Sequence, residues 1–153
     1  MRIAVGADHA GFALKERVRE YLESKGFEVE DLGPATLQPV DYPDYAEKVA
    51  ASVAAKKADF GVLMCGTGLG VAIAANKVPG IRAATCNDTL SAYFARAHND
   101  ANVLTMGGRL TDEATARKIV DVWLSTEFEG GRHARRVEKI GIIDEKNHTE
   151  KQL

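Results

Sequence analysis

A short glycine-rich segment carries the strongest chemical signal in the sequence. It follows a nearly all-apolar run that ends at Cys65, and three of its five residues are glycine. Glycine lets backbone amides approach an anion closely, and the amino end of a following helix favours negative charge. We therefore expect an anion-binding loop here, with a strand-to-helix turn that binds nothing as the alternative. The loop residues are Gly66, Thr67, Gly68, Leu69 and Gly70.

Two well-known phosphate-binding motifs fail to match this segment. Val71 stands where a dinucleotide fingerprint needs Gly or Ala, and Thr67 stands where a P-loop needs lysine. A nucleotide-binding module therefore remains only an alternative function.

Cys65 is a candidate general base because it lies directly against the glycine loop. A thiol beside the amino end of a helix can ionise near neutral pH and accept a proton. The alternative is a small buried hydrophobic residue, which most free cysteines are. Cys86 has no such loop beside it and is expected in the core.

Polar residues near other expected strands are further candidates. Asp8 and His9 follow the first strand and can bind hydroxyls or phosphate, although Asp8 can instead cap a helix. His98 and Asn99 lie between an expected helix and the next strand, where His98 can act as an acid or base. A surface turn is the alternative for this second pair.

Three arginines can together hold a phosphate dianion. Arg132 and Arg136 are four residues apart and share one face of an expected helix, and Arg109 follows another strand. A solvated basic face is the alternative, and we favour it for Arg135. The sequence predicts no metal site, because Asp8, His9, Cys65 and His98 lack short ligand spacing.

The elements that must position these residues alternate between short β-branched runs and amphipathic helical segments. Such alternation predicts an α/β fold with a five-stranded parallel sheet and helices on both faces. Ligands then bind at the carboxyl ends of the strands. A helical cap is expected at Thr111, and a polar, frayed tail is expected from residue 147. The expected strands are 2–7, 27–33, 59–65, 81–86 and 102–107. The expected helices are 10–26, one from Pro43, one that follows the 66–70 turn and ends near Lys77, 88–98, one from Thr111, and one from 133 to the mid-140s.

Length and composition narrow the class of protein. The chain has 153 residues, which corresponds to one domain, 1–153. A net charge of −2 argues against bulk nucleic-acid binding, and no stretch is long and apolar enough for a membrane span. Two cysteines cannot build a disulfide framework, and the amino terminus does not read as a signal peptide. We therefore expect a cytoplasmic protein.

Several segments together resemble the ribose-5-phosphate isomerase B family, which includes the galactose-6-phosphate isomerase subunits. They are GADHAGFALK, DYPD, CGTGLGVAIAANK, GIRAA, HNDANVL, GGR and FEGGRHARRVEKI, in the family's order between residues 2 and 143. The resemblance implies a Rossmann-like sandwich that isomerises a sugar phosphate without metal or nucleotide. It also implies a homodimer, often paired into a tetramer, with active sites at the interface.

The resemblance also implies roles for individual residues. Cys65 is the proton acceptor, residues 66–70 hold the enediolate, and His98 opens the sugar ring, with Asn99 beside it. Asp8 and His9 bind the sugar, and Tyr42 is a wall of the pocket. Thr67 contacts the reacting atoms. Arg132 and Arg136 bind the phosphate, with Arg109 and His98 reaching across from the partner subunit. A pentose phosphate is the expected substrate, and a 6-phosphohexose such as allose or galactose 6-phosphate is the alternative.

Overall fold

A five-stranded parallel sheet forms the centre of the protein in a computed structural model, which describes residues 1–149. The strand order is β2-β1-β3-β5-β4, and every neighbouring pair is parallel. The inner strands are almost entirely buried, as expected for a sheet covered on both faces. The strands are β1 Arg2–Ala7, β2 Glu28–Asp31, β3 Phe60–Cys65, β4 Ala83–Thr85 and β5 Val103–Gly107.

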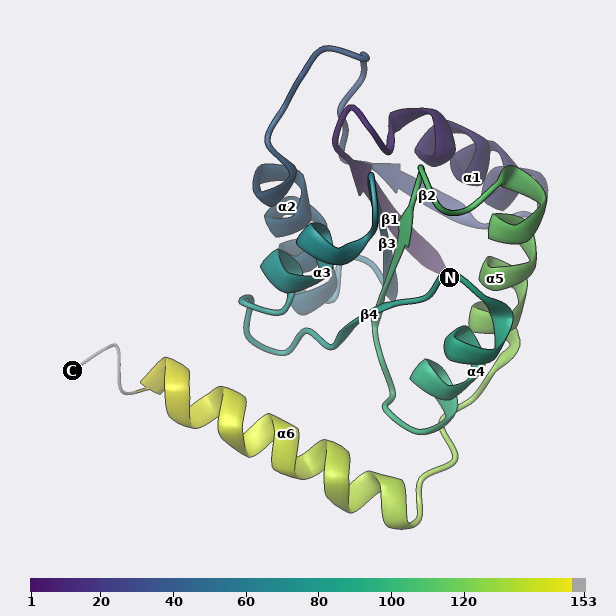
Figure 1. The fold of residues 1–153 in the computed structure, drawn as a ribbon. Helices are drawn as coiled ribbons and strands as arrows, with labels where there is room; N and C mark the ends of the chain where they lie inside the picture. Colours follow the sequence, from purple (N-terminus) through teal and green to yellow (C-terminus); the bar gives the residue numbers. More distant parts are fainter. Residues whose placement is uncertain (150–153) are drawn as a thin grey trace.

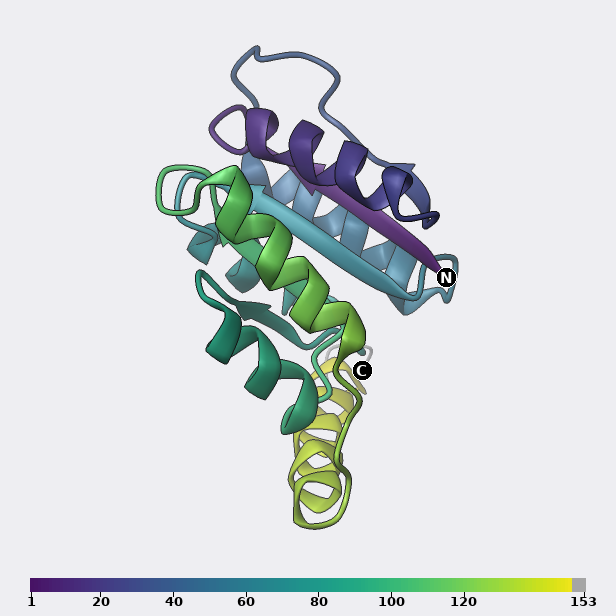
Figure 2. The same ribbon diagram turned by 90° about the vertical axis from the view of Figure 1, so that its right-hand side faces the viewer.

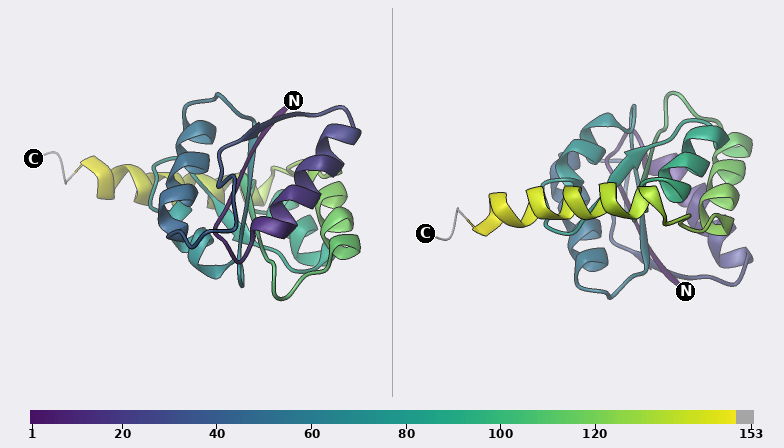
Figure 3. Two further views of the ribbon diagram at one scale, coloured as in Figure 1. Left: turned by 90° about the horizontal axis from the view of Figure 1, so that it is seen from above. Right: turned by 90° about the horizontal axis from the view of Figure 1, so that it is seen from below.

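Helices cover both faces of this sheet, which confirms the predicted three-layer α/β sandwich (Figure 1). Helices α1, α4 and α5 lie on one side of the sheet, and α2 and α3 lie on the other (Figure 3). The helices are α1 Phe12–Ser24, α2 Tyr42–Ala54, α3 Leu69–Ala75, α4 Thr89–Ala97, α5 Glu113–Ser125 and α6 Arg132–Thr149.

Each face of the sheet has its own apolar core. Leu14, Val18 and Leu22 recur at helical spacing on α1 and are buried with Trp123 of α5 in one core. The other core joins α2 and α3 to the opposite face, with Val49 as one of its fully buried members. Each large side chain buried in this way contributes about 1.5–3 kcal/mol. Packing on both faces fixes the strands, and with them the residues at the carboxyl ends of the strands.

Helix α6 projects from the body of the protein (Figures 1 and 2). Within α6 only His133 is buried, whereas Ile140 and Ile143, one turn apart, are exposed. The helix lies at the end of the molecule opposite to the carboxyl ends of the strands (Figure 1). Within residues 1–149, no helix is both long and apolar enough to cross a membrane. An apolar stripe of α6 is therefore left uncovered by its own chain.

Several predicted boundaries were wrong, and three of them illustrate the reasons. The α5 cap is Asp112, whose carboxylate accepts the Thr115 amide at 2.8 Å, while Thr111 donates its hydroxyl to Asn87. Strand β2 is shorter than 27–33 because it is an edge strand that pairs only with β1 before the turn at Gly33, where φ is +99°. Helix α6 includes residues 147–149, which were expected to fray; the rest of that tail lies outside the described residues.

Candidate active site

The carboxyl edge of the sheet brings together polar groups from three neighbouring strands. Asp8 and His9 follow β1, Cys65 ends β3, and Arg109 follows β5. The register places Ala7 opposite Met64 and Cys65 opposite Gly107, so these segments lie side by side. The prediction that residues following these strands gather at this edge is confirmed.

Cys65 is a free and buried thiol that contacts the glycine loop directly. The Gly68 amide donates a hydrogen bond to its Sγ atom over 3.1 Å. Cys86 is also free, but it packs in the core formed with α1, α4 and α5, as predicted. Burial raises the pKa of the Cys86 thiol to about 11, so it stays protonated at neutral pH. Of the two thiols, Cys65 is the one that contacts the glycine loop.

The glycines of the loop are required by three different neighbours. A side chain at Gly68 would meet the Met106 backbone at 2.8 Å, and Gly68 has a φ of +83°. A side chain at Gly70 would meet the Tyr42 ring at 2.7 Å, and one at Gly66 would meet the Arg109 guanidinium at 3.2 Å. The loop is therefore packed tightly between β5 and these two side chains.

Thr67 and Leu69 form a local turn within this loop. The Thr67 hydroxyl accepts the Leu69 amide at 3.2 Å, while the Leu69 side chain is exposed. The hydroxyl still has its own hydrogen to donate. Thr67 can therefore shape the loop and contact a ligand at the same time.

Asp8 and His9 are fixed by backbone hydrogen bonds. The buried Asp8 carboxylate accepts the Gly11 amide at 3.0 Å, which closes the turn before α1. His9 Nδ1 accepts the Val40 amide at 3.3 Å, so the neutral ring carries its hydrogen on Nε2. Nε2 of His9 is thereby set up as a donor on the exposed side of the ring.

Arg109 belongs to the same edge as Cys65 of its own chain. Its amide bonds to the Gly66 carbonyl at 3.0 Å, the neighbouring Gly108 amide bonds to the Cys65 carbonyl at 2.8 Å, and its guanidinium lies beside Gly66. The expectation that Arg109 reaches the site from a partner subunit is corrected by this geometry.

A second group of polar residues lies at the amino edge of the sheet. His98 ends α4 and Asn99 follows it, both before β5 begins, and Arg132 and Arg136 are exposed in the first turns of α6. This edge is separated from Cys65 by the length of β5, whose five residues span about 17 Å. A single chain therefore does not bring its two groups of predicted residues together.

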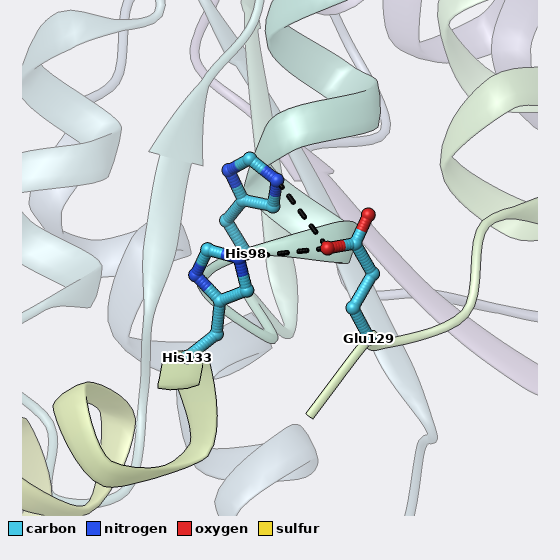
Figure 4. A group of neighbouring side chains, drawn as sticks. All are labelled: His98, Glu129 and His133. Carbon is cyan, nitrogen blue, oxygen red and sulfur yellow. Dashed lines mark ion pairs between the residues drawn. The ribbon is translucent and has the colours of Figure 1, made fainter. Parts of the chain in front are cut away.

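Two residues of this second group were missed by the sequence reasoning. Nε2 of His98 and Nε2 of His133 lie 3.6 and 3.5 Å from one Glu129 carboxylate oxygen, with the two rings stacked at 4.0 Å (Figure 4). Burial and the neighbouring His98 and Arg132 lower the pKa of His133, so its ring is neutral at pH 7. The spacing of Glu129 and His133, four residues apart, was the available signal.

The cluster of His98, Glu129 and His133 has the residue types of a metal site, although the sequence predicts none. Their ligand atoms lie within 4.8 Å of one another, which is close enough to share an ion. That prediction considered His98 but neither Glu129 nor His133. The adjacent Arg132 and Arg136 add positive charge, which opposes a divalent cation at this place.

Comparison with known proteins decides the family. The sequence model of the ribose/galactose isomerases matches residues 3–140. The chain belongs to the ribose/galactose isomerase family. The part shared with the ribose/galactose isomerases includes every predicted site residue from Asp8 to Arg136.

Individual members of the ribose/galactose isomerase family are similar over nearly the whole chain. Ribose-5-phosphate isomerase B of Escherichia coli strain K12 is 47% identical over 147 residues, which cover 96% of this chain and 99% of that protein. D-erythrulose-4-phosphate isomerase of Pectobacterium atrosepticum is 45% identical, and the match covers 99% of this chain and 98% of that protein. The structure of ribose-5-phosphate isomerase B from Clostridium thermocellum superposes with a TM-score of 0.95 at 50% identity. The superposition covers 96% of this chain and 99% of that one.

Proposed function

We propose that this chain interconverts ribose 5-phosphate and ribulose 5-phosphate through an enediolate, with Cys65 as the base. The two relatives with the ribose-5-phosphate name support the reaction and the substrate. The observation that carries the choice of base is the hydrogen bond from the Gly68 amide to Cys65 Sγ. This bond holds the sulfur against the glycine loop, beside the amides that would face the reacting atoms.

The chemistry follows from the carboxyl edge. The thiolate of Cys65 takes the proton from C2 of the open-chain aldose and returns it to C1, while the hydroxyl proton moves from O2 to O1. Negative charge grows on oxygen in between, and the backbone amides of the glycine loop stabilise it. The loss of one such donor typically raises the barrier by about 3 kcal/mol. The reaction is balanced within the substrate, so the proposal includes no cofactor.

The remaining roles are those that the resemblance to the family implies. Asp8 and His9 bind sugar hydroxyls, Tyr42 forms a wall, and Thr67 contacts the reacting atoms. His98 opens the sugar ring, with Asn99 beside it. The phosphate is held by Arg109, Arg132 and Arg136, because a guanidinium binds phosphate through paired hydrogen bonds. Binding the unreactive phosphate positions the reacting carbons.

These roles require two copies of the chain. The base and the loop lie at one edge of the sheet, whereas His98 and the two α6 arginines lie at the other. A homodimer that places the amino edge of one copy on the carboxyl edge of the other completes two equal sites. Large apolar side chains are exposed near both edges and suit such an interface: Leu69, Ile73, Leu90, Phe94, Ile140 and Ile143.

The proposal also places the protein in its metabolic setting. We expect the enzyme to work in the cytoplasm. Two dimers can pair into a tetramer through surfaces outside the sites.

A substrate panel tests the proposed activity. Purified protein is given ribose 5-phosphate, allose 6-phosphate, galactose 6-phosphate and erythrulose 4-phosphate, the last because of the Pectobacterium relative. We expect kcat/KM to be highest for ribose 5-phosphate. Preference for another sugar keeps the chemistry and replaces the substrate, whereas tight binding without turnover indicates a sugar-phosphate sensor. Binding of an adenine nucleotide in an equilibrium titration supports the nucleotide-binding alternative.

A further inference from the structure

Two threonines on neighbouring strands reach the carbonyl oxygen of Gly68. Thr105 of β5 and Thr85 of β4 are register partners. Their Oγ1 atoms lie 2.7 Å and 3.1 Å from the Gly68 oxygen and 2.9 Å from each other. Thr105 is completely buried and Thr85 is half-buried. The Gly68 carbonyl is thereby tied to the sheet beneath the loop.

The hydroxyl of Thr105 stands in surroundings that otherwise favour an apolar side chain. Its neighbours on this face of the sheet include Leu63 and Val103, both fully buried. Valine has the same shape and a similar preference for strands. A buried hydroxyl costs stability unless it is hydrogen-bonded, and here the carbonyl of Gly68 is its partner. The hydroxyl is therefore satisfied by the Gly68 carbonyl and the Thr85 hydroxyl, and the carbonyl is the nearer partner.

Holding the Gly68 carbonyl also fixes the direction of two backbone amides. In a trans peptide the C=O and the following N–H point in opposite directions, so the Leu69 amide points away from the sheet. It donates to the Thr67 hydroxyl. On the other side of the Gly68 Cα atom, the Gly68 amide points at Cys65 Sγ. Rotation about either bond of Gly68 would turn one of these donors away.

We infer that Thr105, assisted by Thr85, is a positioning residue that holds the glycine loop in its reactive conformation. It sets the Gly68 amide on the Cys65 sulfur and the Leu69 amide on the Thr67 hydroxyl. The inference rests on the proposed function for the isomerisation step, because it assigns the loop amides to the enediolate. Its effect on Cys65 itself can be measured without any substrate.

Four variants separate the hydroxyl from the shape of the side chain. Thr105→Val removes the hydroxyl and keeps the shape, Thr105→Ser keeps the hydroxyl, and Thr85→Val removes the assisting group. Thr126→Val is the matched control, because its hydroxyl donates to the Val122 carbonyl at the end of α5, away from the loop. Circular dichroism and thermal melting establish that each variant is folded. If Thr105→Val does not fold, Thr85→Val carries the test.

Steady-state kinetics provide the first measurement. We expect Thr105→Val to lower kcat about tenfold with KM changed less than about twofold, since the loop amides act mainly in the transition state. Thr105→Ser is expected to stay within about threefold of the wild type. An unchanged kcat in Thr105→Val, or a Thr105→Ser variant as slow as Thr105→Val, overturns the inference.

Alkylation of Cys65 by iodoacetamide, followed by mass spectrometry of the peptide that contains it, is the second measurement. We expect it to change about fivefold in Thr105→Val, because the Gly68 amide that hydrogen-bonds the Cys65 sulfur is no longer held in place. Thr126→Val is expected to react like the wild type. If the wild type turns over no sugar phosphate, the proposed function fails. The alkylation rates then still decide the inference, and equal rates in Thr105→Val and the wild type overturn it.

Discussion

The backbone amide of Gly68 donates a hydrogen bond to the sulfur of Cys65 over 3.1 Å, across the turn between β3 and α3. This bond ties the thiol to the glycine loop, although the Cys65 side chain also packs in the core beside α2 and α3. Cys86 shows the contrast, since its thiol has no loop beside it and burial raises its pKa to about 11.

The first prediction concerns the base. Cys65→Ala is expected to lower kcat about 100- to 10,000-fold, which is the range for loss of a general acid or base. Binding of the unreactive analogue ribitol 5-phosphate, measured by calorimetry, should be retained. Cys86→Ala is the matched control and should keep the wild-type kcat. Substantial turnover by folded Cys65→Ala assigns the base to another residue.

The second prediction compares two glycines with positive φ. Gly68→Ala is expected to destabilise the protein by roughly 3 kcal/mol or more, because the added carbon both strains the backbone and overlaps Met106. Gly26→Ala meets no atom within 4 Å and should lose only about 1–2 kcal/mol from strain. Urea unfolding measures both losses, and equal losses would contradict the close packing of Gly68 on β5.

The third prediction concerns pH and His133. Its pKa is lowered in the folded protein, mainly by burial and then by His98 and Arg132; Arg136 adds to this and Glu129 opposes it. The unfolded chain therefore binds the proton more tightly, so stability falls as the pH drops through 6.5 toward the lower folded pKa. His133→Gln removes this contribution. We expect the melting temperature of the wild type to fall more between pH 7.5 and 5 than that of the variant, and parallel falls refute the assignment.

The fourth prediction separates two neighbouring arginines of α6. Arg136→Ala is expected to raise KM at least about tenfold with little change in kcat, because it removes charge-assisted hydrogen bonds to the unreactive phosphate. Arg135→Ala removes an equally exposed charge and should change KM less than about twofold. If the two variants have the same KM, Arg136 does not bind the phosphate.

The sequence was sufficient to predict the sheet and the carboxyl edge of the site. Apolar runs and helical spacing such as Leu14, Val18 and Leu22 report burial directly, and the end of a parallel strand must lie at the ligand edge. The position of Cys65 beside the loop follows from these two rules.

Contacts between segments that are far apart in the sequence could not be predicted from it. His98 and Glu129 lie close together because of the path of the chain between α5 and α6, and no local sequence pattern predicts that path. Thr85 and Thr105 read as ordinary β-branched strand residues, and only the register reveals their shared contact with Gly68.

If each site combines the two edges of different chains, a mixing experiment can restore activity from two inactive variants. Cys65→Ala and His98→Asn are each expected to be nearly inactive alone. When the two are co-expressed with different tags, half of the dimers are mixed, and each mixed dimer has one intact site. Roughly a quarter of the wild-type activity should then return. Asp8→Ala mixed with Cys65→Ala should restore none, since both changes lie on one edge. No recovery in the first mixture, with mixed dimers present, would show that each site is built within a single chain.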